Sequence, residues 1–317
     1  MTPIGAAHRW LRVAASVAAP VARVTPVLPM VIVALLLSVA PGVQASQKKY
    51  SAFGLVLKIN APSEFVVSCK EIPGFMDAMV MAVGVRDPEN LKTIRPGVLV
   101  DFTLVVDSDS SYADNIKIHR FESSDQRPLE VRMLEMIEGA FDAKPSAPQM
   151  LAVDQKVPDF TLVDQYRHPL NFSALSGKVV AISFVYTRCS FPEYCFRLSN
   201  NLGLVAKRFT DRLDNDLVLL TITFDPTNDG PEALSKYANM WKASAKRWYF
   251  LTGPPAEVKR VCLMFGMNFW PDMGMIVHSM HTAVIDRQGR LVANLEGNEF
   301  TADQLGNLLK TVMDRRP

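Results

Sequence analysis

The sequence predicts a small all-β barrel domain followed by an α/β domain. Its 317 residues suit two domains at roughly 100 to 200 residues each. Between residues 53 and 119, short strand-like runs alternate with turn residues, which is typical of a barrel, whereas from Gln149 onward strands alternate with helices. With 49% hydrophobic and 21% charged residues the chain has a globular composition, so each domain can bury its own core.

The charge balance argues against nucleic acid as a partner. The chain has 34 Lys and Arg against 32 Asp and Glu. Three of the basic residues, Arg9, Arg12 and Arg23, lie in the first 45 residues, which contain no acidic residue. The rest of the chain is therefore nearly neutral and offers no bulk positive charge to phosphates.

Residues 1–45 are expected to be a signal peptide or an N-terminal anchor. The stretch from Val24 to Gln47 is uncharged, and its apolar centre, Met30 to Ala40, is short for a helix that needs about 20 residues to cross a bilayer. Small residues at Val43 and Ala45 suit signal peptidase cleavage. Both alternatives make the protein extracytoplasmic, for example periplasmic, and the uncleaved form would associate with a membrane.

Residues 46–122 are expected to form the barrel domain. Its predicted strands are Gly54–Ile59, Phe65–Ser68, Met79–Val85, Val98–Val106 and Tyr112–His119. Residues 123–148 are expected to form an amphipathic helix, at 129–142, and a linker, because Pro145 and Pro148 break the helix.

Residues 149–317 are expected to form the α/β domain. Two near-continuous apolar runs, Val179–Tyr186 and Leu217–Phe224, are typical of strands buried on both faces of a sheet. Helices are predicted at about 195–210, 231–243, 255–266 and 301–315, and Thr301 and Gln304 fit a capping box for the last. A hairpin is predicted at residues 282–295.

Two cysteines follow the first buried strand. Cys189 and Cys195 lie at its carboxyl end, where a helix should begin and where function concentrates in open α/β sheets. The N–H groups of a helix start stabilise a thiolate, which is a good nucleophile and a soft-metal ligand. Pro192 favours a turn between the two sulfurs, so an inert disulfide is the structural alternative. Cys262 falls in a predicted helix and is expected to be buried and inert.

A copper site would need a third ligand, and imidazole suits Cu(I) beside thiolates. His278 and His281 lie in a stretch, 272–281, that is expected to be a loop. A lone loop histidine is more often a surface side chain than a ligand, and spacing alone does not bring either ring near Cys189.

The stretch from about Val153 to the C-terminus resembles the Sco/SenC family, thioredoxin-fold copper proteins of cytochrome c oxidase assembly. The matching segments are Val157–Phe160, Tyr186–Cys189 with Cys195, Thr223–Pro226, Pro231–Glu232, Tyr237–Ala238, Leu251–Gly253, His278–Ser279 with Thr282, and Ile285–Gly289. One departure is that five residues separate the cysteines where the family usually has three, and Phe196 replaces the proline that usually follows.

The resemblance implies a thioredoxin-like fold and a copper site, for Cu(I), Cu(II) or both. Its ligands would be Cys189, Cys195 and His278, with Asp225 as a supporting or alternative ligand. The two cysteines would also be a redox-active pair, and His281 would remain a surface residue. The implied function is a metallochaperone or thiol-disulfide factor that matures the dinuclear copper centre of cytochrome c oxidase. The partner would be the copper-bearing oxidase subunit or another copper protein.

The barrel carries a second candidate site at Cys69, Met79 and Met81. Met79 and Met81 project from one face of a strand, and composition alone favours core packing for them. The stretch from Gly54 to Ile118, however, resembles the CusF-like copper-binding domain, an OB-type barrel, with Ile72–Met76 and Met79–Met81 as matching segments. Cys69 stands where that family has histidine, and we expect it to act as a softer Cu(I) ligand.

Other functions remain open. Thr187 and Cys189 after a buried strand also suit a thiol:disulfide oxidoreductase, including a protein-disulfide reductase, or a peroxidase. Copper sequestration for resistance is a third alternative.

Overall fold

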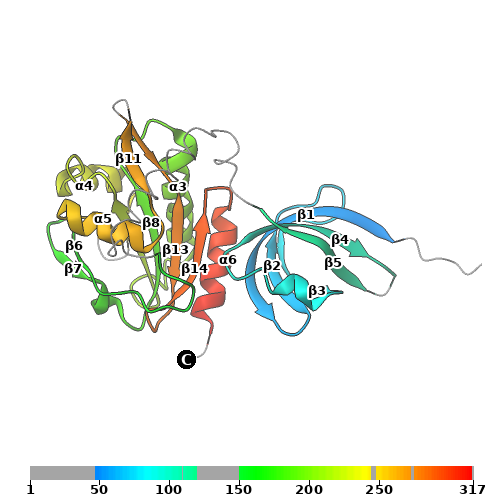
Figure 1. Cartoon of the computed structure of the whole chain (residues 1–317). Helices are drawn as coiled ribbons and strands as arrows, with labels where there is room; N and C mark the ends of the chain where they lie inside the picture. The colour runs from blue at the N-terminus through cyan, green and yellow to red at the C-terminus, as the bar shows by residue number, and fades with distance from the viewer. Residues whose placement is uncertain (1–46, 109, 120–149, 244–247, 273–274, 316–317) are drawn as a thin grey trace, which may run out of the picture. The chain divides into compact units, whose positions relative to one another are not determined.

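The computed structural model of the chain describes residues 47–108, 110–119, 150–243, 248–272 and 275–315 (Figure 1). The expected signal segment, residues 1–45, and the expected helix and linker, residues 123–148, lie outside the described residues. Within the described residues, no helix is long and apolar enough to cross a membrane.

The first domain is a closed five-stranded barrel, as the sequence predicts. The strands follow one another around the barrel in the order β1-β2-β3-β5-β4. Their bounds are β1 (Lys48–Asn60), β2 (Glu64–Cys69), β3 (Met79–Val85), β4 (Leu99–Val106) and β5 (Ser111–Ile118), with a short 3₁₀ helix η1 (Pro88–Leu91) after β3.

The long strand β1 closes the barrel by pairing with β2 on one side and β4 on the other. The register between β1 and β2 shifts between Val56 and Lys58, and such a bulge bends a strand and increases its twist. Alternate side chains fill the interior, where the rings of Phe65 and Phe102 meet edge to face at 5.9 Å.

The second domain is built on a seven-stranded mixed sheet with the strand order β14-β13-β8-β9-β10-β6-β7. The strands are β6 (Thr161–Asp164), β7 (Pro169–Asn171), β8 (Val179–Val185), β9 (Leu217–Thr223), β10 (Trp248–Thr252), β13 (His281–Ile285) and β14 (Leu291–Glu296). Strands β8, β9 and β10 are parallel, and the outer strands pair antiparallel. The predicted hairpin is β13 and β14.

Helices pack on this sheet close to the predicted positions. They are the 3₁₀ helix η2 (Phe172–Leu175), the π-helical turn η3 (Pro192–Phe196), α3 (Arg197–Arg208), α4 (Pro231–Met240), α5 (Pro255–Met264) and α6 (Ala302–Met313). Helix α3 packs against α6, and a hydrogen bond of 2.9 Å between Ser199 Oγ and Tyr237 OH joins it to α4. Thr301 and Gln304 form the predicted capping box at α6.

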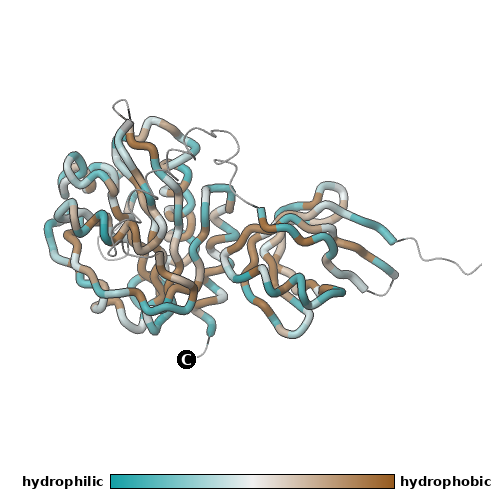
Figure 2. The backbone as a smooth tube through the Cα atoms, in the orientation of Figure 1, coloured by the Kyte–Doolittle hydropathy of each residue, from teal (hydrophilic) through white to brown (hydrophobic). Residues whose placement is uncertain are grey.

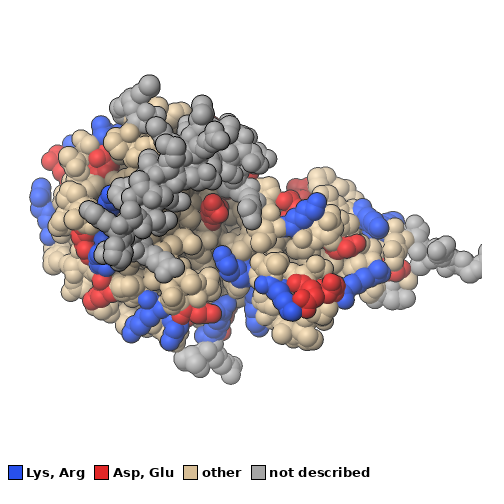
Figure 3. Space-filling view, in the orientation of Figure 1, with Lys and Arg blue, Asp and Glu red and all other residues tan. Residues whose placement is uncertain are grey.

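The centre of the sheet explains why the two apolar runs form strands. Every residue of β8 and β9 is buried, and the hydropathy colouring of Figure 2 shows brown strands inside this domain. Val185 pairs with Thr223, so the two strands end side by side. The loops that leave β8 and β9 therefore start at the same edge of the sheet. On the face shown in Figure 3, basic and acidic side chains are interspersed, as expected from the nearly neutral composition.

The predicted loop at residues 272–281 is wrong. Strands β11 (Phe269–Asp272) and β12 (Met275–His278) pair antiparallel as a separate two-stranded sheet. Phe269 lies opposite His278, and the ring of Phe269 lies 5.4 Å from that of Phe224, which follows β9. This packing stabilises a hairpin that the local sequence, with Pro271 in its first strand, does not predict.

Candidate metal centre

The two cysteines lie where β8 ends and a helix begins. Cys189 is in the loop after β8, where its N–H donates to Tyr186 O at 3.2 Å, and its side chain is buried. Cys195 lies in η3, which starts at Pro192 and continues into α3, and it is fully buried. All four cysteines of the chain are free thiols in the structure, so no disulfide joins Cys189 to Cys195.

His278 ends β12 and turns its ring toward the cysteine loop. Its Nδ1 lies 2.8 Å from the carbonyl oxygen of Ser279, which leaves Nε2 available for a metal once Nδ1 carries the proton. The ring is enclosed by aromatic neighbours: Phe224 at 4.7 Å, Tyr186 at 5.9 Å and Tyr194 at 6.3 Å between ring centroids. The fold thus brings together the imidazole and two thiols that are far apart in sequence.

Cys189 is the centre of this arrangement. Both the Cys195 thiol and the His278 ring act on the pKa of its thiol. Among the described residues, no three His, Cys, Asp or Glu side chains already form a closed group with metal-site geometry. To bind an ion, the His278 ring and the Cys195 sulfur would therefore have to rearrange so that both point at the ion together with the Cys189 sulfur. The donor set of two soft sulfurs and one imidazole fits Cu(I).

The two thiols differ in acidity. The hydrogen bond from the Cys195 thiol, assisted by the His278 ring, lowers the pKa of Cys189 to about 4 despite its burial. The same hydrogen bond, together with burial, raises the pKa of Cys195. The expected thiolate therefore lies on Cys189, in the loop, and not on the cysteine inside the helical turn. Burial and the neighbouring cysteine sulfurs raise the pKa of Tyr186 to about 12.

Asp225 lies beside the site, after β9, and it is held by other side chains. Its Oδ2 accepts a hydrogen bond of 2.7 Å from Arg188 Nη2, and Asn228 Nδ2 donates to both carboxylate oxygens at 2.9 and 3.1 Å. To act as a supporting or alternative copper ligand, which is a proposal, Asp225 would have to give up hydrogen bonds to Arg188 or Asn228.

His281 was expected at the surface, whereas the structure shows it partly buried. It begins β13, its Nδ1 is a buried atom without a hydrogen-bond partner of good geometry, and burial lowers its pKa to about 4. The ring approaches Gly266, where a Cβ would lie 3.3 Å from it. The missing side chain at Gly266 thus makes room for the ring. Cys262 is fully buried as expected, and burial raises its pKa.

Cys69 and Met79 of the barrel lie directly opposite each other on β2 and β3, and Met81 pairs with Val67. Directly opposite residues share one face of a sheet, so all three sulfur-bearing side chains project from the same side. Met81 packs against the barrel core, whereas Met79 is 50% exposed. Core packing therefore accounts for Met81 and leaves Met79 without that explanation. Burial raises the pKa of Cys69.

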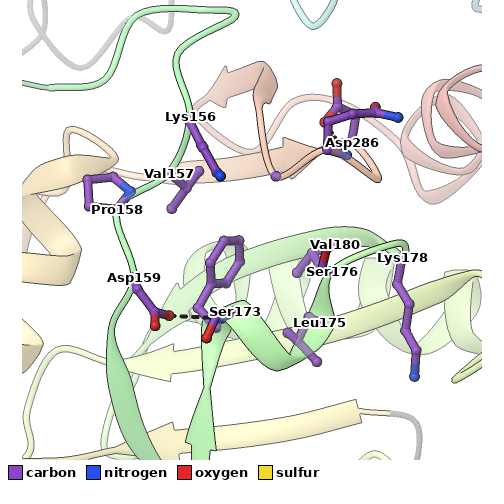
Figure 4. A pocket seen from close by; sticks show the side chains of 13 residues that line it. Lys156, Val157, Pro158, Asp159, Ser173, Leu175, Ser176, Lys178, Val180 and Asp286 are labelled. Atoms are coloured by element: carbon purple, nitrogen blue, oxygen red, sulfur yellow. Dashed lines mark hydrogen bonds between the residues drawn. The ribbon is translucent and has the colours of Figure 1, made fainter. Parts of the chain in front are cut away.

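A pocket in the α/β domain lies at another position (Figure 4). Its lining includes Val180, near the start of β8, and Asp286, just after β13, whereas Cys189 follows the end of β8. Asp159 in this pocket accepts a hydrogen bond of 2.8 Å from Ser173 N. Its lining contains no sulfur and no imidazole, so it offers nothing to the chemistry of the cysteine site.

Sequence reasoning missed the side chains that hold the cysteine loop. Asp229, which follows β9, binds Thr187 at the start of the loop, and Asn298, after β14, donates from Nδ2 to Glu193 O near its end. No motif marks these contacts, because their partners are 42 and 105 positions away.

Comparison with known proteins places this domain in a family. The model of the SCO1/SenC family matches residues 148–314, which is more than half of the chain. The chain belongs to the SCO1/SenC family. Among relatives, a putative copper-binding protein of Stutzerimonas stutzeri is 24% identical over 170 residues, covering 52% of this chain and 80% of the relative. The SCO1 protein homolog of Bacillus subtilis is 28% identical over 154 residues, covering 47% and 78%.

A solved structure is similar to part of the chain. The crystal structure of yeast Sco1 with copper bound aligns with a TM-score of 0.43 at 26% identity, covering 50% of this chain and 90% of that protein. The seven-stranded sheet itself gives the second domain of this SCO1/SenC protein the predicted α/β class, and the barrel domain precedes it in the chain.

Proposed function

We propose that this SCO1/SenC protein is an extracytoplasmic copper chaperone in which Cys189, Cys195 and His278 bind the ion. The position of the His278 ring, 5.9 Å from the ring of Tyr186 and 6.3 Å from that of Tyr194 on the two sides of Cys189, carries this proposal. Two thiols and one imidazole are ligands that Cu(I) prefers. A relative of this chain is named as a putative copper-binding protein, which supports the same cargo.

The proposed recipient is the dinuclear copper centre of cytochrome c oxidase. Copper held by buried thiols can pass to another thiol-bearing protein by ligand exchange, without release of the ion. The uncharged N-terminal segment supports export to the periplasm or another extracytoplasmic compartment, with anchoring to the membrane if it is not cleaved.

The test of delivery is made in cells that lack the gene and are complemented with variants. Cys189→Ala and His278→Ala should fail to restore oxidase activity, whereas a buried control, Cys262→Ala, should restore it. Full oxidase activity with Cys189→Ala at equal protein level would contradict delivery and leave copper sequestration as the alternative.

A thiol-disulfide role is the second candidate, because a second thiol, that of Cys195, lowers the pKa of Cys189. A Cys189 thiolate could attack a disulfide of a target protein, and Cys195 could then resolve the mixed disulfide. Reduction of a disulfide in the oxidase copper subunit by the purified protein would support this role. Rapid peroxide consumption would instead favour a peroxidase.

We also propose a second Cu(I) site at Cys69, Met79 and Met81. The cross-strand pair of Cys69 and Met79 and the exposure of Met79 favour it. Because burial raises the pKa of Cys69, binding of Cu(I) there must release a proton.

A full-length variant without Cys189 and Cys195 should still bind one Cu(I), and adding Cys69→Ser to this variant should abolish the remaining Cu(I) binding. Unchanged binding in the latter protein would exclude this site.

A further inference from the structure

Asp229 is a fully buried carboxylate whose two oxygens are both engaged. Oδ1 accepts a hydrogen bond of 2.5 Å from Thr187 Oγ1. Oδ2 accepts from Thr187 N at 2.9 Å and from Thr223 Oγ1 at 2.7 Å. The three donors are a backbone N–H and two hydroxyls, so this acidic side chain is stabilised by neutral groups. Burial of a carboxylate is costly, and these bonds offset the cost only while all of them are kept.

These contacts tie the cysteine loop to the neighbouring strand. Thr187 lies two residues before Cys189, and Thr223 is the last residue of β9. The Asp229 side chain therefore fixes both the backbone N–H and the hydroxyl of Thr187, at the start of the cysteine loop. Hydrogen bonds to a carboxylate are shorter and stronger than those between neutral groups, which makes Asp229 an effective anchor.

Further hydrogen bonds hold Asp229 and its neighbours in place. Asp229 N donates to Asp225 O at 2.8 Å, and Thr223 Oγ1 accepts from Asp225 N at 3.0 Å. Asp225 in turn binds the side chain of Arg188 at 2.7 Å. Both residues that precede Cys189 are thus held by the loop that follows β9.

The far end of the cysteine loop is held as well. Asn298, which is 7% exposed, donates from Nδ2 to the carbonyl oxygen of Glu193, two residues before Cys195. Five residues separate the two cysteines, and a segment of that length would lose conformational entropy on binding an ion unless it were ordered beforehand. The hydrogen bonds of Asp229 to Thr187 and of Asn298 to Glu193 order the two ends of this segment beforehand.

We propose that Asp229 is a positioning residue of the metal centre, which holds Thr187 so that the Cys189 sulfur faces Cys195 and His278 before copper arrives. This inference rests on the proposed copper site. Asp229 does not bind the ion and acts only through the loop, so its loss should alter the geometry of the bound copper as well as the affinity.

The test uses the reduced full-length protein and competition with a chromophoric Cu(I) chelator. Asp229→Asn keeps the size of the side chain but places an amide donor against Thr187 N–H or the Thr223 hydroxyl. Loss of a side chain that orients metal ligands typically costs about 10- to 100-fold in affinity, and we expect a loss in this range. In a separate sample loaded with Cu(II), the thiolate-to-Cu(II) charge-transfer band should also shift, since the sulfur no longer has a fixed direction.

Two hydroxyl variants give a second measurement in case Asp229→Asn does not fold. Thr187→Val removes only the Oγ1 bond to Asp229, whereas Thr187→Ser keeps a hydroxyl at the same place. We expect Thr187→Ser to bind copper more tightly than Thr187→Val and to keep a charge-transfer band closer to that of the wild type. Equal affinities and spectra for the two would overturn the inference.

Asp164→Asn is the matched control. Asp164 is also a buried aspartate, 4% exposed, and its Oδ1 accepts from Tyr166 N and His168 N, each at 2.8 Å. It precedes the turn between β6 and β7, so its loss should destabilise the fold without changing copper affinity or spectrum. A folded Asp229→Asn protein that binds copper like the wild type would also overturn the inference. Absence of copper binding by the wild type would instead refute the proposed function.

Discussion

At the scale of single residues, the chemistry proposed for Cys189 depends on a thiolate whose negative charge a neighbouring thiol stabilises. The hydrogen bond from Cys195 and the interaction with His278 lower the pKa of Cys189 to about 4. We predict that the reduced protein keeps one thiolate down to about pH 5, far below the ~8.5 of a free thiol. Ultraviolet thiolate absorbance followed through an acid titration measures it.

Cys195→Ala serves as the comparison, since it removes the hydrogen bond that lowers the pKa of Cys189 most while it leaves His278 in place. The pKa of Cys189 should rise in this variant. A wild-type protein whose thiolate signal vanishes already near pH 8, or a Cys195→Ala protein with an unchanged titration, would contradict the proposed sharing of one proton between the two sulfurs.

His281 makes stability depend on pH. Burial lowers its folded-state pKa to about 4, below the 6.5 of an unperturbed histidine. The unfolded chain therefore binds a proton more readily, and the contribution of the neutral, partly buried ring is present above pH 6.5 and lost as the pH falls toward 4. This single group should remove at most about 3 kcal/mol over that window.

Urea unfolding at about pH 7 and pH 5 measures the effect, and His281→Gln should make the difference between the two smaller. The exposed His168, whose side chain is 76% exposed, provides a control, because His168→Gln should leave the difference unchanged. An equal pH dependence in wild type and His281→Gln would refute the assignment.

At the scale of elements, the hairpin of β11 and β12 decides where the imidazole lies. Ser279 holds its base: Oγ accepts from Asn268 N at 2.9 Å and donates to Gly266 O at 3.1 Å. Ser279→Ala should destabilise the protein by about 1 to 3 kcal/mol, since it leaves a partly buried N–H unpaired. We expect copper affinity to fall by up to about tenfold, because His278 is then less well held.

Thr301→Ala separates the two effects in chelator-competition and unfolding experiments. It removes the cap of α6, which costs about 1 kcal/mol, and it contacts none of the three proposed ligands. If Thr301→Ala and Ser279→Ala changed copper affinity equally, the hairpin would not act through His278.

The same elements show what the sequence could predict. The runs that form β8 and β9 are apolar throughout, so their burial and the position of Cys189 at the end of β8 follow from local pattern. The hairpin of β11 and β12 does not, because Pro271 argues against a strand. Its strands exist because each supplies the other's hydrogen bonds and because Phe269 packs on Phe224.

Contacts between distant residues were beyond the reach of local pattern. Asp229 reads as a turn residue in the sequence, and its role depends on Thr187, which only the parallel pairing of β8 and β9 brings near. His281 reads as an exposed loop residue because no local signal indicates that Gly266 leaves space for its ring. For His278, only the resemblance to a family could indicate a role as a ligand.

At the scale of the whole molecule, one chain joins a barrel with a cross-strand cysteine and methionine to a SCO1/SenC domain with a thiol-imidazole centre. Both candidate sites offer soft ligands, so the protein would carry copper and not a hard cation. The described surface shown in Figure 3 has no field of one charge sign, which suits a protein that recognises partners by local fit and not by bulk charge.

The central claim is that Cys189, Cys195 and His278 together hold one copper ion. X-ray absorption at the copper edge tests it most directly, on the reduced full-length Cys69→Ser protein loaded with one equivalent of Cu(I). We predict two sulfur ligands and one nitrogen ligand, loss of the nitrogen in His278→Ala, and loss of the copper in the Cys189→Ala, Cys195→Ala double variant. A copper ion with the same ligands and the same content after both cysteines are removed would contradict the account.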